Sequence, residues 1–119
     1  MGRHYILDGH RPVPCDDFMA WGTFMDKVDG RRVGETSVGD IWVSTVFLGL
    51  DHRYGNGPPM LFETMAFIDD ESLSCDRYST WEQAETGHAL VVQAAHQQMT
   101  LVSLAATLMI ETIASRSAT

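Results

Sequence analysis

IWVSTVFLGL, at residues 41–50, is the strongest strand signal in the sequence. It is dense in β-branched and aromatic side chains, and apolar residues fall on both of its faces, which predicts a central strand covered on both sides. A second run of this kind, MLFETMAF, follows at residues 60–67. Because the two runs are close in sequence, we expect them to pair as an antiparallel hairpin. This hairpin predicts a small antiparallel sheet of about three to five strands.

The residues before this hairpin predict further short elements. RHYIL is typical of a short strand, and the turn Asp8-Gly9 leads to HRPVPC, which suits an edge strand or a loop. A helix is expected over about residues 16–28, because apolar side chains recur there at the spacing of one helical face. The residues of that face are Phe18, Trp21, Met25 and Val28. A further strand is expected over residues 31–38.

The residues after the hairpin predict one dominant helix. DDESLSCD suggests an acidic turn, and Ser79 with Glu82 then has the spacing of a capping box. No proline occurs from residue 80 to about residue 114, so we expect either one long helix or two helices broken near Gly87 or residues 97–98. A bend is favoured over a full break.

The second half of this helix is apolar nearly all round, which is typical of a helix buried against more than one neighbour. We therefore expect residues 95–119 to be a helical extension of a single α+β domain that spans residues 1–119. A symmetric partner is a reasonable source of the missing cover, so residues 95–114 are expected to join copies into a homodimer or a higher homo-oligomer.

Composition excludes several classes of function. A formal net charge of −8 disfavours direct binding to DNA or RNA, because the phosphate backbone is itself negative. The longest apolar run, residues 99–110, is too short to cross a bilayer. Cys15 and Cys75 follow no metal-site spacing and are expected to be reduced thiols. We expect a cytoplasmic protein with no membrane partner and no cofactor.

One helix face suggests a metal site. Glu85, His88 and His96 fall at i, i+3 and i+11, and the first two resemble half of a di-iron ligand set. A second motif of this kind and further facing carboxylates are missing from the sequence. We therefore expect these side chains to be solvent-facing polar residues and no metal to be bound.

The connection between the two central strands is the best candidate site. Its glycines allow a ligand to approach the backbone, and its prolines fix the rim. Glu63 lies in the following strand, where a carboxylate is costly unless it is paired. The candidate ligand-binding or partner-binding residues are Asp51, His52, Arg53, Tyr54, Asn56 and Glu63.

These residues leave two functions open. Asp51, His52 and Glu63 could in principle perform acid and base chemistry, although they could equally cap the loop backbone or face solvent. No nucleophile elbow, P-loop or dinucleotide fingerprint occurs, so an enzyme has only this cluster to rely on. Aromatic groups at Trp21, Trp42, Tyr54 and Trp81 could add a stacking surface, with Trp21 and Trp81 expected in the core. Binding is therefore better supported than catalysis, and no catalytic residue is assigned.

Two segments carry a resemblance to a known family. VSTVFLGLDHRYGNGPPMLFETMAF, at residues 43–67, and RYSTWEQAETGHALVV, at residues 77–92, resemble a family of small proteins common in bacteriophages, prophages and their bacterial hosts. The resemblance covers most of the chain, from DGHRPVPC onward. The chain differs from the short members of the family by its apolar extension after about Ala94.

The resemblance implies a phage accessory protein that acts in the host cytoplasm. Such proteins often occupy a host protein, a nuclease or a nucleotide signal used in defence. The leading hypothesis is therefore a non-enzymatic protein that binds and inhibits or modulates a host defence or nucleic-acid-processing factor. The alternative is a small nucleotide-binding module that sequesters a signalling nucleotide, or a small enzyme, using the cluster at residues 51–63.

Overall fold

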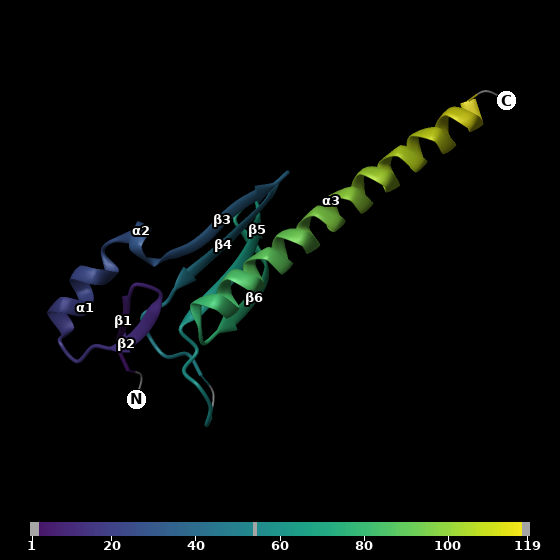
Figure 1. Cartoon of the computed structure of the whole chain (residues 1–119). Helices are drawn as coiled ribbons and strands as arrows, with labels where there is room; N and C mark the ends of the chain where they lie inside the picture. Colours follow the sequence, from purple (N-terminus) through teal and green to yellow (C-terminus); the bar gives the residue numbers. More distant parts are fainter. Residues whose placement is uncertain (1–2, 54, 118–119) are drawn as a thin grey trace.

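The predicted hairpin forms the centre of a four-stranded antiparallel sheet in the computed structural model, which describes residues 3–53 and 55–117 (Figure 1). The strand order is β3-β4-β5-β6. β4 and β5 pair along their whole length, from Ile41 opposite Ile68 to Phe47 opposite Phe62. The four strands are β3 (Arg32–Val38), β4 (Ile41–Phe47), β5 (Phe62–Ile68) and β6 (Glu71–Tyr78). The prediction of a small antiparallel sheet is confirmed.

β6 replaces the acidic turn predicted over DDESLSCD. Only Asp69 and Asp70 form the turn, and both have positive φ, 47° and 67°, as expected of a tight two-residue hairpin turn. The residues that follow pair with β5 as an edge strand. A polar sequence suits an edge strand, because one side of it faces solvent rather than another strand. The prediction of a turn over the whole segment was therefore wrong.

The N-terminal residues form a separate two-stranded hairpin and two short helices. β1 (Tyr5–Asp8) pairs with β2 (Arg11–Pro14) around the predicted turn. The helix predicted over residues 16–28 is instead two helices, α1 (Phe18–Met25) and α2 (Val28–Arg31). Lys27 leaves the helical conformation, with φ −89° and ψ 88°. Both ends of the predicted apolar face, Phe18 and Val28, are consequently exposed.

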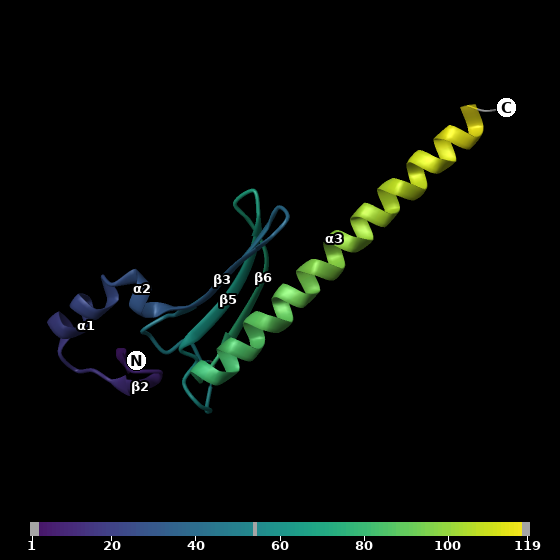
Figure 2. The ribbon, with the colours of Figure 1, turned by 45° about the horizontal axis from the view of Figure 1, so that its top comes forward.

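α3 (Trp81–Ser117) is a single helix of 37 residues. It begins at a capping box one residue later than predicted: the Gln83 side chain accepts hydrogen bonds from the amides of Ser79 and Thr80, and the Thr80 hydroxyl accepts one from the Gln83 amide. The helix is continuous through Gly87 and residues 97–98, and its ribbon shows no sharp bend (Figure 2). Gly87 serves close packing, since a Cβ atom there would lie 2.1 Å from the Tyr78 hydroxyl oxygen.

The first half of α3 covers one face of the sheet and buries two apolar clusters. One lies beneath the middle of the helix: Val38, Ile41, Val43, Ala66 and Ala95. The other lies near its N-terminus, where β1, α1 and Trp81 add cover: Phe47, Leu61, Phe62 and Ala84. β4 alternates between buried and less buried residues, so it is covered on one face only. The prediction of a strand covered on both sides was wrong.

The second half of α3 projects beyond the sheet (Figures 1 and 2). This projection gives the molecule extents of 74 × 29 × 21 Å. In the part of the chain that the structure describes, no helix combines the length and the apolar character needed to cross a membrane.

Candidate functional site

The sheet face opposite α3 is left uncovered by the described elements (Figure 2). Residues opposite one another on neighbouring strands share a face, and the side chains that alternate with the buried ones point away from α3. We call this surface the open face; its residues are Glu35, Trp42, Val46, Glu63, Met65, Phe67, Cys75 and Arg77. It combines apolar and charged side chains, as interaction surfaces commonly do.

An aromatic pair dominates the open face. Trp42 and Phe67 are opposite each other in the register of β4 and β5, and their rings stack with centroids 5.5 Å apart and an interplanar angle of 28°. Trp42 is still 40% exposed. A large aromatic group held in place by its neighbours and still accessible is well suited to anchor a partner.

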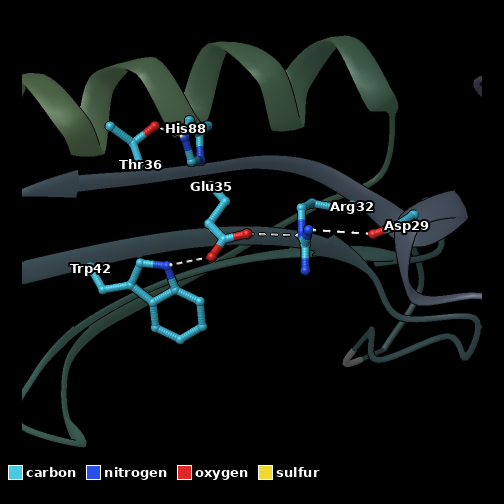
Figure 3. Close-up of polar contacts among 6 residues, drawn as sticks. All are labelled: Asp29, Arg32, Glu35, Thr36, Trp42 and His88. Atoms are coloured by element: carbon cyan, nitrogen blue, oxygen red, sulfur yellow. Dashed lines mark hydrogen bonds and ion pairs between the residues drawn. The ribbon is translucent and has the colours of Figure 1, made fainter.

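A row of polar contacts fixes the indole of Trp42 (Figure 3). Its Nε1–H donates to Glu35 Oε1 over 3.1 Å. The other Glu35 oxygen pairs with Arg32 Nε at 3.2 Å, and Arg32 also reaches Asp29 at 3.5 Å. Surface ion pairs of this kind contribute little to stability, but they restrict the rotamers of the side chains involved. Trp42 is therefore oriented without being buried.

Glu63 is paired within the sheet. Arg77 Nε donates to Glu63 Oε2 over 3.0 Å from the neighbouring strand, and Cys75 Sγ lies 3.4 Å from the same oxygen. The expectation that this carboxylate needs a partner is confirmed, since Arg77 forms an ion pair with it. Cys75 is exposed as a residue, yet the partial burial of its sulfur and the adjacent Glu63 carboxylate raise the pKa of the thiol.

Carboxylates cluster beside the aromatic pair. The turns Gly39-Asp40 and Asp69-Asp70 connect successive antiparallel strands and therefore lie at the same end of the sheet, next to Trp42 and Phe67. Glu71 adds a further acid at this end. No lysine or arginine occurs from residue 33 to residue 52 or from residue 54 to residue 76. This rim of the open face is therefore negative.

Asp51 holds the long loop between β4 and β5 together. Its Oδ1 accepts hydrogen bonds from the amides of Arg53 and Met60, at 2.9 and 3.1 Å, and its Oδ2 pairs with Arg53 Nε at 3.0 Å. Burial alone would raise the pKa of Asp51, but these hydrogen bonds and the Arg53 guanidinium outweigh it and lower that pKa. Asp51 therefore joins the two ends of the loop.

The remaining predicted site residues are divided between two places. The His52 amide donates to the Met60 carbonyl, and the Arg53 guanidinium donates to the Gly57 carbonyl. Asn56 is exposed at the loop tip, and Tyr54 lies outside the described residues. Glu63 belongs to the open face with Arg77, whereas Asp51, His52 and Arg53 belong to the loop. The predicted binding role of these residues stays a prediction.

His88 lies beneath α3 in a chain of hydroxyl groups (Figure 3). Its Nε2 is 2.9 Å from Thr36 Oγ1 and its Nδ1 is 2.7 Å from Thr45 Oγ1, which in turn is 2.6 Å from Thr64 Oγ1. Every threonine hydroxyl can both donate and accept, so a neutral imidazole satisfies this chain in either direction. Gly34 leaves room for the ring, because a Cβ atom there would lie 3.0 Å from it.

The environment of His88 corrects the expectation of a solvent-facing histidine. Burial lowers the pKa of His88, since the imidazolium would lose hydration under the helix. Glu85 and His96 are exposed, away from this position. Among the described residues, no group of three or more His, Cys, Asp and Glu side chains is placed to hold a metal ion.

Comparison with protein-family models, with curated proteins and with solved structures finds no match to this chain. Of the residues of the open face, the sequence analysis assigned only Trp42 and Glu63 to a candidate binding surface, and Phe67 was missed. The signal was available, since alternation in the hairpin puts Trp42 and Phe67 on the same face once the register is known.

Proposed function

We propose that this chain is a non-enzymatic binding protein whose open face covers a basic segment of a partner protein. The observation that carries the proposal is the stacked and partly exposed pair Trp42 and Phe67 on a sheet face that the described elements leave uncovered. In protein interfaces, tryptophan contributes disproportionately to affinity because it brings a large, rigid apolar area.

Charge supports a basic partner. The chain carries −8 overall, and the acidic rim lies beside the aromatic pair. A lysine or arginine side chain can place its cation over the Trp42 ring, which is worth about 0.5–1 kcal/mol at an exposed site, while the rim carboxylates accept its hydrogen bonds. Electrostatic complementarity of this kind also speeds association with the correct partner and rejects acidic competitors.

The side chains that could serve in catalysis are either buried or bonded to other groups of the protein. Thr45 and Thr64 are 0% exposed, so no substrate reaches the hydroxyls next to His88. Asp51 bonds to the loop backbone, and Glu63 bonds to Arg77. Following the resemblance to phage accessory proteins, the proposed partner is a host defence or nucleic-acid-processing protein whose basic surface is blocked by this chain.

Paired alanine variants test the proposal. The wild-type protein is used to capture partners from a bacterial lysate, and the captured protein is purified and titrated against Trp42→Ala and Phe18→Ala. Phe18 is a matched control, since it is an aromatic residue of α1 with 67% exposure. We expect Trp42→Ala to weaken binding by about tenfold or more, Phe18→Ala to leave it unchanged, and added salt to weaken it. Equal affinity of the Trp42→Ala variant would refute the proposal.

A further inference from the structure

The helix-side face of the sheet is wider than one helix. Four strands spaced about 4.8 Å apart span roughly 15–20 Å, whereas a helix with its side chains is about 10 Å wide. α3 packs most closely on β3 and least on β6. Ser74 and Asp76 of β6 are opposite Ala66 and Thr64, which α3 buries, yet both are exposed. β6 is thus the strand that α3 covers least.

A groove runs between α3 and β6. One part has a volume of about 340 Å³ and is bordered by Ile68, Ala94 and Gln98. The next part, about 480 Å³, is bordered by Asp76 and Leu90. The two parts share Ser74, Val91 and Ala94, so they form one continuous groove along the helix. Apart from Gln98, its wall on α3 is apolar, and Leu90 is exposed there.

The projecting half of α3 has the sequence of a helix with two apolar faces. The helix positions that continue the sheet-facing stripe Ala84, His88, Val91 and Ala95 at spacings of three and four are all apolar: Val102, Ala106, Met109 and Ile113. The positions that continue the groove-facing stripe Leu90 and Ala94 are apolar at Leu101, Ala105 and Leu108 and polar at Thr112. The remaining side is polar at Thr100, Ser103, Thr107 and Glu111 and apolar at Leu104 and Ile110. This half thus continues two apolar stripes, as in a helix that packs on a sheet and beside another helix, yet Leu108 and Met109, one from each stripe, are 54% and 66% exposed.

We infer that the projecting half of α3 from a second copy of this chain occupies the groove over β6, and that the exchange is mutual. Met99 is the midpoint of Trp81–Ser117. Two α3 helices that pair antiparallel around Met99 place residues 100–117 of each copy alongside residues 81–98 of the other. Two helical segments then cover each sheet: the N-terminal half of its own α3 and the C-terminal half of α3 from the second copy. The same surface is used by both copies, so the contact is isologous, as in a two-fold dimer.

Charge fits this arrangement. Residues 86–110 contain no Asp, Glu, Lys or Arg, so the paired helices bring no like charges together along their central part. After Arg77, the chain has one basic residue, Arg116. The antiparallel register places position 116 level with Glu82 of the second copy, and Glu82 borders a pocket that adjoins the groove at Gly87 and Leu90. Opposite charges at the ends of an antiparallel helix pair favour this register over a parallel one.

Light scattering on the full chain tests the inference with a matched pair of variants. We expect the wild type to have twice the 13.2 kDa mass of one chain. Ala94→Arg fills the groove and should give a monomer. Ala89→Arg makes the same change at an exposed position that borders none of the described parts of the groove, and it should remain dimeric. Circular dichroism melting confirms that both variants are folded.

Cysteine cross-linking tests the register independently. In a background with Cys15 and Cys75 replaced by serine, the double variant Leu90→Cys, Leu108→Cys should form a covalent dimer under oxidation, because position 90 of one copy lies opposite position 108 of the other. Each single variant should stay uncross-linked, whereas a parallel pair would cross-link in the single variants. A monomeric wild type, or a dimer that survives Ala94→Arg, overturns the inference and leaves the role of the open face untouched.

Discussion

Trp42 of β4 stacks on Phe67 of β5, across the two central strands of the sheet and on the face turned away from α3. The Glu35 carboxylate holds the indole in place from β3, so three strands contribute to one accessible aromatic surface. A pair that existed only for stability would not require this degree of exposure. The two faces of the sheet thus differ: one is buried beneath α3, and the described elements leave the other uncovered.

The stacking pair should contribute modestly to stability. Because Trp42 is only partly buried, we expect Trp42→Ala to lower the free energy of unfolding by about 1 kcal/mol, on the scale of an aromatic pair. Chemical denaturation measures this. A loss of about 4 kcal/mol or more would mean that Trp42 is a core residue, and the loss of binding in that variant would then have no specific meaning.

Stability should depend on pH through His88. Its pKa is lowered in the folded state from the ordinary value of 6.5, so the unfolded chain binds the proton more readily. The free energy of unfolding is then unaffected by this group well above pH 6.5 and decreases as the pH falls below that value. Denaturant titrations between pH 8 and pH 5, compared with His88→Gln, measure the effect. If the free energy of unfolding changes equally with pH in the wild type and in His88→Gln, His88 does not cause the pH dependence.

Gly87 should be intolerant of any side chain. Gly87→Ala places a methyl group against Tyr78 and should destabilise the fold by about 1–3 kcal/mol, as overpacking does. Gly22→Ala in α1 is the matched control, because nothing lies within 4 Å of its added Cβ atom, and it should stabilise the protein by about 0.5–1 kcal/mol. Tyr78→Ala should restore tolerance at Gly87, and failure to do so would point to a different constraint.

Substitutions of Asp51 and His52 should differ in their effect on the free energy of unfolding. Asp51→Ala removes both Oδ1, which accepts from the amides of Arg53 and Met60, and Oδ2, which pairs with Arg53, and we expect a loss of about 1–3 kcal/mol in the free energy of unfolding. His52→Ala should change the free energy of unfolding by no more than about 0.5 kcal/mol.

Calorimetric titration with cyclic nucleotides tests the alternative function, a nucleotide-binding module. Specific uptake that is lost in His52→Ala, with no protein partner recovered, would favour the nucleotide-binding module.

The sequence predicted the secondary structure best where the apolar pattern was long and regular. The central hairpin and the long helix followed from runs in which propensity and packing agree. β6 was missed because an edge strand rich in Ser, Asp and Glu has little intrinsic β character and is specified by its pairing with β5. α1 ended early because helical spacing alone did not guarantee neighbours for Phe18 and Val28.

The site was harder to predict because it depends on which sheet face α3 covers. Apolar residues on both faces of residues 41–50 concealed that Trp42 points to the uncovered side. His88 falls at the spacing of the stripe Ala84, Val91 and Ala95, which indicates an inward position, but its partners could not be predicted because Gly34 and three threonines on separate strands form its surroundings. Such long-range coincidences leave no local pattern in one sequence.

The most direct test of the open face is the indole Nε1–H signal of Trp42 in NMR spectra of the labelled protein during titration with the captured partner. The chain has three tryptophans, so three such signals are expected, and Trp42→Phe assigns one of them by its absence. We predict that the Trp42 signal shifts or broadens on binding while those of Trp21 and Trp81 stay in place. If the partner shifts the Trp21 or Trp81 signal and leaves the Trp42 signal unchanged, it does not bind the open face.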